Sequence, residues 1–118
     1  MILGSVENGV PKIELTIGNR TWRALVDTGF NGDLELPMEL QPVIKAVFLF
    51  RMKSLLAAGQ SIEEDCYAVV VPFDGRKVAA EVTFCAGGEI TLGTGMLRDH
   101  VLTVDFPEKT VQLRRRND

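Results

Sequence analysis

Short stretches of alternating apolar and polar residues, separated by turn residues, run along most of the chain. In residues 12–17, isoleucine and leucine alternate with lysine, glutamate and threonine, which predicts a strand with one buried face. Gly18-Asn19 is a two-residue turn signal, so residues 21–26 are expected to return as the second strand of a hairpin. Similar patterns continue to the C-terminus and predict a mostly β fold. The further strands are expected at 34–37, 47–56, 62–71, 77–84, 90–93, 101–106 and 110–113.

The remaining segments are less regular. Residues 1–10 show little periodicity and fit either an edge strand or a loose arm. Residues 38–46 fit either a short helix or an irregular crossing, because Pro42 argues against a long helix. The small residues at 57–61 are expected to form the turn at the tip of a hairpin. Thr94 is expected to cap a short helix that extends to about residue 99.

One stretch, Leu25-Val26-Asp27-Thr28-Gly29, places a carboxylate where an apolar strand stops. A carboxylate at the end of a buried strand costs free energy unless another group pairs with it or uses it. Asp27 is therefore the first candidate for a functional residue. The alternative is an ordinary turn, because Asp, Thr and Gly are all common in turns.

Length and charge limit the class of protein. With 118 residues, the chain is long enough for one domain with one core, and we expect a single domain over 1–118. The formal net charge is -3, and the basic cluster at 114–116 fits a solvated tail better than a nucleic-acid-binding surface. The N-terminus has no signal-peptide pattern, and the longest apolar run is too short to span a bilayer. We therefore expect a cytoplasmic protein with no nucleic-acid or membrane partner.

Two cysteines and one histidine limit the zinc sites and serine-activating triads that this chain can build. Cys66 and Cys85 do not have metal-ligand spacing, and we expect free thiols on neighbouring strands. With His100 as the single histidine, neither a zinc cluster nor a Ser-His-Asp triad is easy to build. No metal or other cofactor is expected. We expect His100 at a helix end, and Asp74 and Asp105 in turns or at strand ends.

Three elements, taken in order, resemble the retropepsin-like aspartic proteases over about residues 13–113. Residues 25–29 resemble the catalytic strand and loop of that family, and residues 57–61 resemble its flap. Residues 90–93, with the short helix that follows, resemble its apolar-apolar-glycine element. Asp27-Thr28-Gly29-Phe30, followed by Leu36-Pro37, is most similar to the small, single-domain prokaryotic members. The resemblance implies a single-lobe, closed β fold with a flap hairpin and one short C-terminal helix.

The resemblance also implies a mechanism and an oligomeric state. Hydrolysis by aspartate requires two carboxylates around one water: one accepts its proton, and the other, protonated, hydrogen-bonds the scissile carbonyl. In aspartic proteases the two carboxyls share one proton and titrate as a pair. Because this chain has one such aspartate, activity implies a two-fold homodimer to which each copy gives Asp27. The leading hypothesis is an aspartic endopeptidase that hydrolyses extended segments of a peptide or protein substrate.

The resemblance assigns roles to residues of this chain. Thr28 is expected to bond across the two-fold axis to the partner's loop, and Gly29 to leave room for the substrate backbone. Gly59 is expected to let the tip of the flap close over a bound peptide. The expected substrate-binding residues are Phe30, Asn31, Leu56, Ala58, Gly59 and Ile90, and Ile62 is a further candidate for the cleft wall. For the apolar members of this set, ordinary core packing is an equally good interpretation.

Several residues depart from the better-known pattern. Phe30 replaces a small residue after the triplet, and Gly95 stands where many relatives have Asp or Asn. Asn31 and Thr94 occupy the places of an Asp-Arg ion pair in viral enzymes, so a hydrogen bond or a looser dimer is expected instead. These departures leave open a catalytically weak or inactive peptide-binding or dimerisation module on the same fold. A third alternative is a structural domain with an accidental triplet. Residues 1–10 and 111–118 are the candidates for a dimer sheet.

Overall fold

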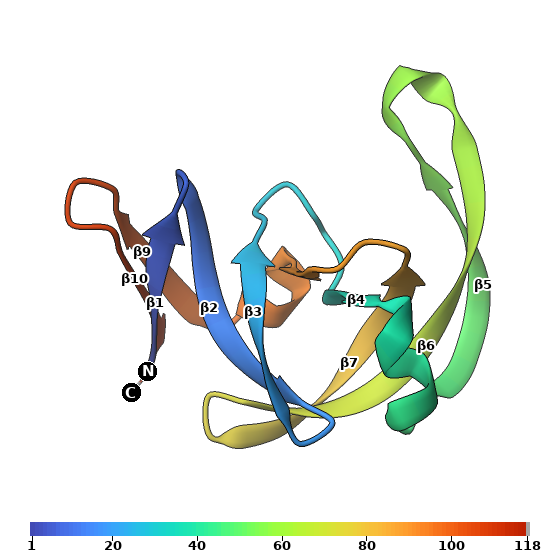
Figure 1. The fold of residues 1–118 in the computed structure, drawn as a ribbon, viewed down its shortest axis with the longest axis horizontal. Coiled ribbons are helices and arrows are strands. Elements are labelled where there is room, and N and C mark those ends of the chain that lie inside the picture. Colours follow the sequence, from blue (N-terminus) through green and yellow to red (C-terminus); the bar gives the residue numbers. More distant parts are fainter. Residues whose placement is uncertain (118) are drawn as a thin grey trace.

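Almost all regular structure in the computed structural model, which describes residues 1–117, is β (Figure 1). The strands form one ten-stranded sheet in the order β5-β6-β7-β4-β8-β3-β2-β1-β10-β9. The strands are β1 (Ile2–Glu7), β2 (Val10–Ile17), β3 (Arg20–Val26), β4 (Leu34–Pro37), β5 (Val47–Leu55), β6 (Ser61–Phe73), β7 (Arg76–Cys85), β8 (Ile90–Leu92), β9 (His100–Asp105) and β10 (Thr110–Arg115). Three short 3-10 turns, η1 (Met38–Val43), η2 (Ala57–Gly59) and η3 (Thr94–Leu97), complete the elements. The mostly β fold expected from the sequence is confirmed.

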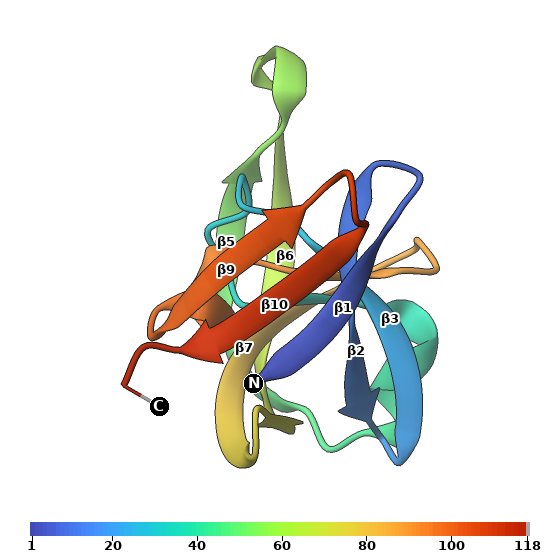
Figure 2. The ribbon, with the colours of Figure 1, turned by 90° about the vertical axis from the view of Figure 1, so that its left-hand side faces the viewer.

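The core lies on the apolar faces of these strands, as the alternating pattern predicts. In β2, every second residue from Ile13 is buried, and the residues between them face solvent. The β2–β3 hairpin turns at Gly18 and Asn19, whose φ angles of 61° and 63° match a two-residue turn of the favoured hand. The β9–β10 hairpin and β1 close one end of the sheet (Figure 2). No helix within residues 1–117 is long and apolar enough to cross a membrane.

The N-terminal segment differs from both expectations for it. β1 is neither an edge strand nor a loose arm, because it pairs with β2 on one side and with β10 on the other. Ile2 lies opposite Leu113, and Ser5 lies opposite both Thr110 and Lys12. The two terminal segments proposed for a dimer sheet therefore pair with each other within one chain; residue 118 lies outside the described part.

Three strands at the centre of the sheet position the loop that contains Asp27. β8 lies between β3 and β4, parallel to β3 and antiparallel to β4. The loop 27–33 connects β3 to β4, and it emerges on the same side of the molecule as the β5–β6 hairpin (Figure 1). The loop and the hairpin are thus brought to one side by strands that are separate in sequence.

Candidate active site

Backbone hydrogen bonds fix Asp27 at the point where β3 ends. Its amide donates to the Leu92 carbonyl at 2.9 Å, which continues the pairing with β8 by one residue. Its carboxylate Oδ1 accepts a hydrogen bond from the Gly29 amide at 2.9 Å, and the Phe30 amide donates to the Asp27 carbonyl at 3.2 Å. Asp27 is half-buried, whereas Thr28 and Gly29 are exposed. The carboxylate therefore has a defined direction at an accessible surface.

Backbone hydrogen bonds join the segment after β8 to the loop that contains Asp27. The amides of Gly93, Thr94 and Gly95 donate to the carbonyls of Asp33, Phe30 and Gly32, at 2.9, 2.8 and 3.0 Å respectively. Thr94 does not cap η3, whose first turn has no side-chain cap. Its hydroxyl donates to the Phe30 carbonyl at 3.3 Å instead. A side-chain hydrogen bond thus joins the two segments, but its acceptor is the Phe30 carbonyl and not Asn31.

Close contact between these segments explains two glycines. A Cβ on Gly93 would overlap the Gly32 carbonyl oxygen and lie 2.6 Å from the Phe30 ring. A Cβ on Gly95 would overlap the Asp33 carboxylate, whose other oxygen accepts the Glu81 amide at 2.9 Å. Gly95 therefore leaves the space that Asp33 fills, so the absence of Asp or Asn at residue 95 follows from packing.

The β5–β6 hairpin contains most of the other predicted site residues at its tip. The tip is closed by a hydrogen bond from the Leu56 amide to the Gln60 carbonyl at 2.7 Å. Ala58 and Gly59 both have left-handed backbones, with φ angles of 68° and 77°. Leu56 and Ile62 are 44% and 40% exposed, so apolar surface is open at this tip.

A hollow of about 110 Å³ separates the Asp27 loop from this hairpin. Phe30 lines the hollow from the loop, and Met52 and Ser54 line it from β5. Asn31 is exposed beside Phe30. Ile90 is different: it is 0% exposed and belongs to the core cluster, so we remove it from the candidates for the cleft wall.

Four carboxylates that the sequence did not single out also line this hollow: Asp33, Glu35, Glu64 and Glu81. In Leu34-Glu35-Leu36, the glutamate between two buried leucines is the signal that could have indicated a cleft position. For Glu64 the sequence has no such signal, because it lies in the acidic run 63–65.

Both thiols are free and lie close to these carboxylates. Burial raises the pKa of Cys66, and the charges of Glu81 and Asp33 raise it further. Burial also raises the pKa of Cys85, with a smaller contribution from Glu35, which hydrogen-bonds the thiol. The thiols are therefore protonated at neutral pH and are poor nucleophiles.

A second group of charged residues lies at the other end of β6, and its role was not anticipated. Asp74 is in the β6–β7 turn, as expected, but its side chain is only 5% exposed. Its carboxylate contacts the Met1 ammonium at 2.8 Å, His100 Nε2 at 2.9 Å and Arg115 at 3.5 Å. His100 begins β9 and does not lie at a free helix end. We call these four residues the Asp74 cluster; it ties the turn to both terminal segments.

Comparison with solved structures identifies the fold. The chain is similar to the Simian Foamy Virus (mac) protease, with a TM-score of 0.56 and 22% identity over 74% of this chain and 91% of that one. It is similar to a retropepsin-like aspartic protease from Rickettsia conorii, with a TM-score of 0.60 and 18% identity over 96% and 88% of the two chains. The EIAV protease complexed with the inhibitor HBY-793 gives a TM-score of 0.62 and 17% identity over 78% and 88%.

No protein-family model matches the sequence, and no curated protein matches it. At these identities the similarity concerns the fold alone. The chain has the fold of the retropepsin-like aspartic proteases, and the resemblance inferred from its motifs is confirmed at that level.

Proposed function

We propose that this chain is a single-domain aspartic endopeptidase, active as a homodimer in which Asp27 of each copy contributes one carboxylate. The observation that carries the proposal is the fixed geometry of Asp27. Its carboxylate is held by the Gly29 amide at the end of β3, in a loop that is bonded to the segment after β8. Two such loops related by a two-fold axis would bring two carboxylates around one water, with no cofactor.

The exposed residues of the loop suit the roles proposed for them. Thr28 and Gly29 are accessible in the single chain, so Thr28 could bond to the partner's loop and Gly29 could face the substrate backbone. We propose that the β5–β6 hairpin acts as the flap, with Leu56, Ala58 and Gly59 closing over an extended peptide. Main-chain pairing would then hold the peptide, and side-chain hollows would select it.

A specific observation supports the alternative, a peptide-binding or dimerisation module without efficient catalysis. β1 and β10 are paired with each other within one chain, so they are not free to interleave with the same strands of a second copy. Within residues 1–117 the free edges of the sheet are those of β5 and β9. A dimer built on a different edge could hold the two Asp27 loops too far apart to share a water.

The test compares wild type with Asp27→Asn on a mixed peptide library from acid to neutral pH, with sedimentation of the same samples. We expect cleavage by wild-type dimers and none by the variant, because an amide cannot take the water's proton. Asp105→Asn is the matched control, since this exposed aspartate also accepts a backbone amide, that of Glu108, at 3.0 Å. A wild-type dimer that is inert at every pH would favour the module. A strict monomer at high concentration would exclude the shared-aspartate mechanism.

A further inference from the structure

We infer that the hollow between Phe30 and the β5–β6 hairpin is a subsite for a lysine or arginine side chain of the bound peptide. The inference rests on the proposed peptide-binding function and adds a substrate class to it. The hollow is smaller than the roughly 300–1,000 Å³ typical of sites for whole small molecules, which suits a single side chain.

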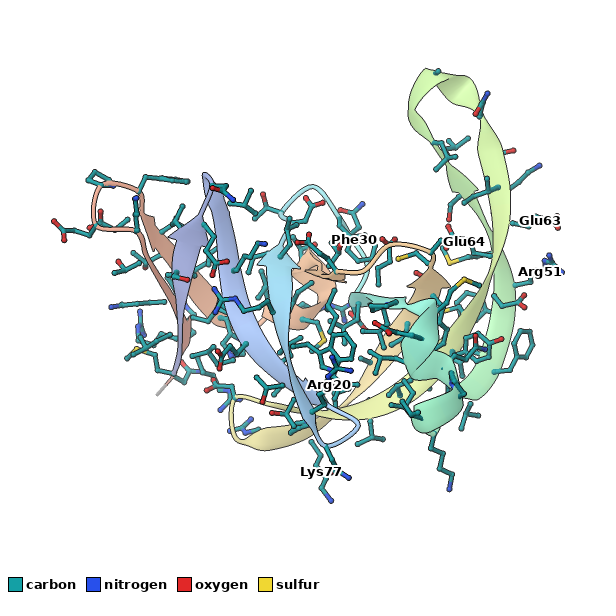
Figure 3. The ribbon with its side chains drawn as sticks, viewed as in Figure 1. Arg20, Phe30, Arg51, Glu63, Glu64 and Lys77 are labelled. Atoms are coloured by element: carbon teal, nitrogen blue, oxygen red, sulfur yellow. The ribbon has the colours of Figure 1, made fainter. Side chains whose placement is uncertain are left out.

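The acidic side chains of the hollow come from one continuous face of the sheet. Glu64 on β6 lies directly opposite Met52 on β5, and Glu35 on β4 lies directly opposite Thr83 on β7. Glu64, Met52, Glu35 and Thr83 all line the hollow. Figure 3 shows Glu64 on the side of the hairpin that faces Phe30. The carboxylates thus surround a space that has an aromatic ring and a methionine in its wall.

No lysine, arginine or histidine lines this hollow. Within residues 1–117, Glu35, Glu64 and Glu81 form no ion pair, although carboxylates elsewhere do. The cations of the hairpin lie on its other face, where Arg51 Nε contacts Glu63 at 3.4 Å and Asp65 at 3.8 Å (Figure 3). The outer face of the hairpin, which carries Arg51, therefore has a cation next to its carboxylates. The inner face, which carries Glu64 and lines the hollow, has none among the lining residues. Uncompensated like charges repel one another, and a cation that enters between them relieves the repulsion.

A long basic side chain matches both properties of the hollow. Its methylene groups can pack against Phe30 and Met52, and its charged end can donate hydrogen bonds to Glu64 or Glu35. No three His, Cys, Asp or Glu side chains of the described chain are arranged to hold a metal ion. Carboxylates spread along a hollow suit an extended cation better than a point charge. An acidic side chain would be repelled, and a neutral one would leave the carboxylates partly desolvated without a partner.

The experiment uses matched peptides built on a sequence that the full-length wild type cleaves or, if none is cleaved, on an extended sequence that Asp27→Asn binds. Lysine, norleucine and glutamate replace one another at each position along the peptide in turn. Binding is measured with Asp27→Asn by fluorescence anisotropy, and cleavage is measured with wild type. At one position we expect lysine to exceed norleucine by about 3- to 10-fold in both readouts, as for partly exposed charge pairs.

The variants identify the carboxylates responsible. Glu64→Gln and Glu35→Gln, made in both backgrounds, are expected to reduce the lysine preference at that position by weakening lysine peptides, whereas norleucine peptides should bind no more weakly than before because less charge is then desolvated. Glu63→Gln is the matched control, because it neutralises the neighbouring residue on the outer face of the same hairpin. It should leave the preference intact, which separates a subsite from general attraction of basic peptides to an acidic protein.

The outcomes separate this inference from the proposed function. Cleavage without any preference for lysine would overturn the subsite and leave the peptidase proposal standing. Lysine-selective binding that Glu64→Gln reduces, with no cleavage by wild type, would support the subsite and count against catalysis. Equal loss of preference with Glu63→Gln and Glu64→Gln would also overturn the subsite, because the attraction would then be non-specific.

Discussion

The loop that contains Asp27 and the hairpin that faces it are constructed in opposite ways. The loop is bonded to the segment after β8 by three backbone hydrogen bonds, and glycines at 93 and 95 allow the two backbones to touch. The hairpin projects away from the rest of the molecule (Figure 1), and all of β5 except Ser54 is exposed. A Cβ on Gly59 at its tip would meet no other atom within 4 Å.

The difference shows where precision and adaptability lie in this fold. A catalytic carboxylate must be held within a fraction of an ångström, so close packing at the centre is consistent with the role proposed for Asp27. Few buried contacts hold the hairpin, so its tip is expected to open at low free-energy cost. The strand β6 is held instead at its far end, where the Asp74 carboxylate contacts Met1, His100 and Arg115.

Substitution of Gly93 should have the largest effect. In Gly93→Ala the new methyl group would overlap the Gly32 carbonyl and crowd the Phe30 ring, which must separate the two segments. We expect the free energy of unfolding to fall by about 3 kcal/mol, measured by urea denaturation. Gly88→Ala is the matched control, because a Cβ there meets nothing within 4 Å and the glycine has no positive φ. Equal stability of the two variants would contradict close packing at the centre.

Asp74→Asn should have the next largest effect, and it tests whether β6 is held from its far end. The amide keeps the shape of the side chain but loses its charge, next to His100, Arg115 and the Met1 ammonium. We expect a loss of about 2 kcal/mol in the free energy of unfolding at neutral pH, because the Met1 ammonium and the largely buried Arg115 lose their counter-charge and His100 loses a charged hydrogen-bond partner. Cleavage or binding by the folded fraction should be unchanged, since this cluster is at the opposite end of the strand.

The pH dependence of the same variant has a defined sign. The Met1 ammonium, followed by His100, lowers the pKa of Asp74 in the folded chain. The unfolded state therefore binds a proton first as the pH falls below about 4, and the stabilisation present above that pH is lost. Wild type should lose stability on acidification more steeply than Asp74→Asn. Parallel curves would show that Asp74 is not responsible, and Asp105→Asn should retain the wild-type slope.

Local patterns explain why much of the fold could be predicted from the sequence. The alternation in 12–17 and the turn at 18–19 determine the β2–β3 hairpin without help from distant residues. The interior position of β1 differs from the expected edge strand or loose arm, because half of its pairing is with β10, more than 100 residues away. Asn8-Gly9 is a turn signal of the same kind as Gly18-Asn19, with φ angles of 51° and 79°, and could have indicated the β1–β2 hairpin.

The sequence could predict the place of a site residue only where its immediate neighbours in the chain indicate that place. Asp27 follows an apolar strand and precedes a glycine, so its position could be inferred from neighbours. The direction of Glu64 could not, because the buried face of β6 changes along the strand: Cys66 is buried toward the hairpin, whereas Val69 and Val71 are buried further along. The contact of Asp74 with His100 joins residues 26 positions apart, and no local pattern predicts it.

Gly59→Ala should have the smallest effect on stability and therefore isolates the function of the hairpin tip. The φ of 77° costs an alanine about 1 kcal/mol, but no neighbour obstructs the methyl group. Gly75→Ala is the matched control, since Gly75 has a φ of 79°, no neighbour within 4 Å, and a place in the turn at the other end of β6. The two variants should lose stability equally in urea denaturation.

Only Gly59→Ala should change peptide turnover, because only this tip would have to close over the substrate. We expect kcat/KM to fall several-fold with Gly59→Ala and to stay at the wild-type value with Gly75→Ala, each measured well below its unfolding transition. Equal kinetics in both variants would mean that the tip does not approach the peptide. The hairpin would then contribute through the face that carries Met52, where side chains of the hairpin and of the Phe30 loop line the two sides of the hollow.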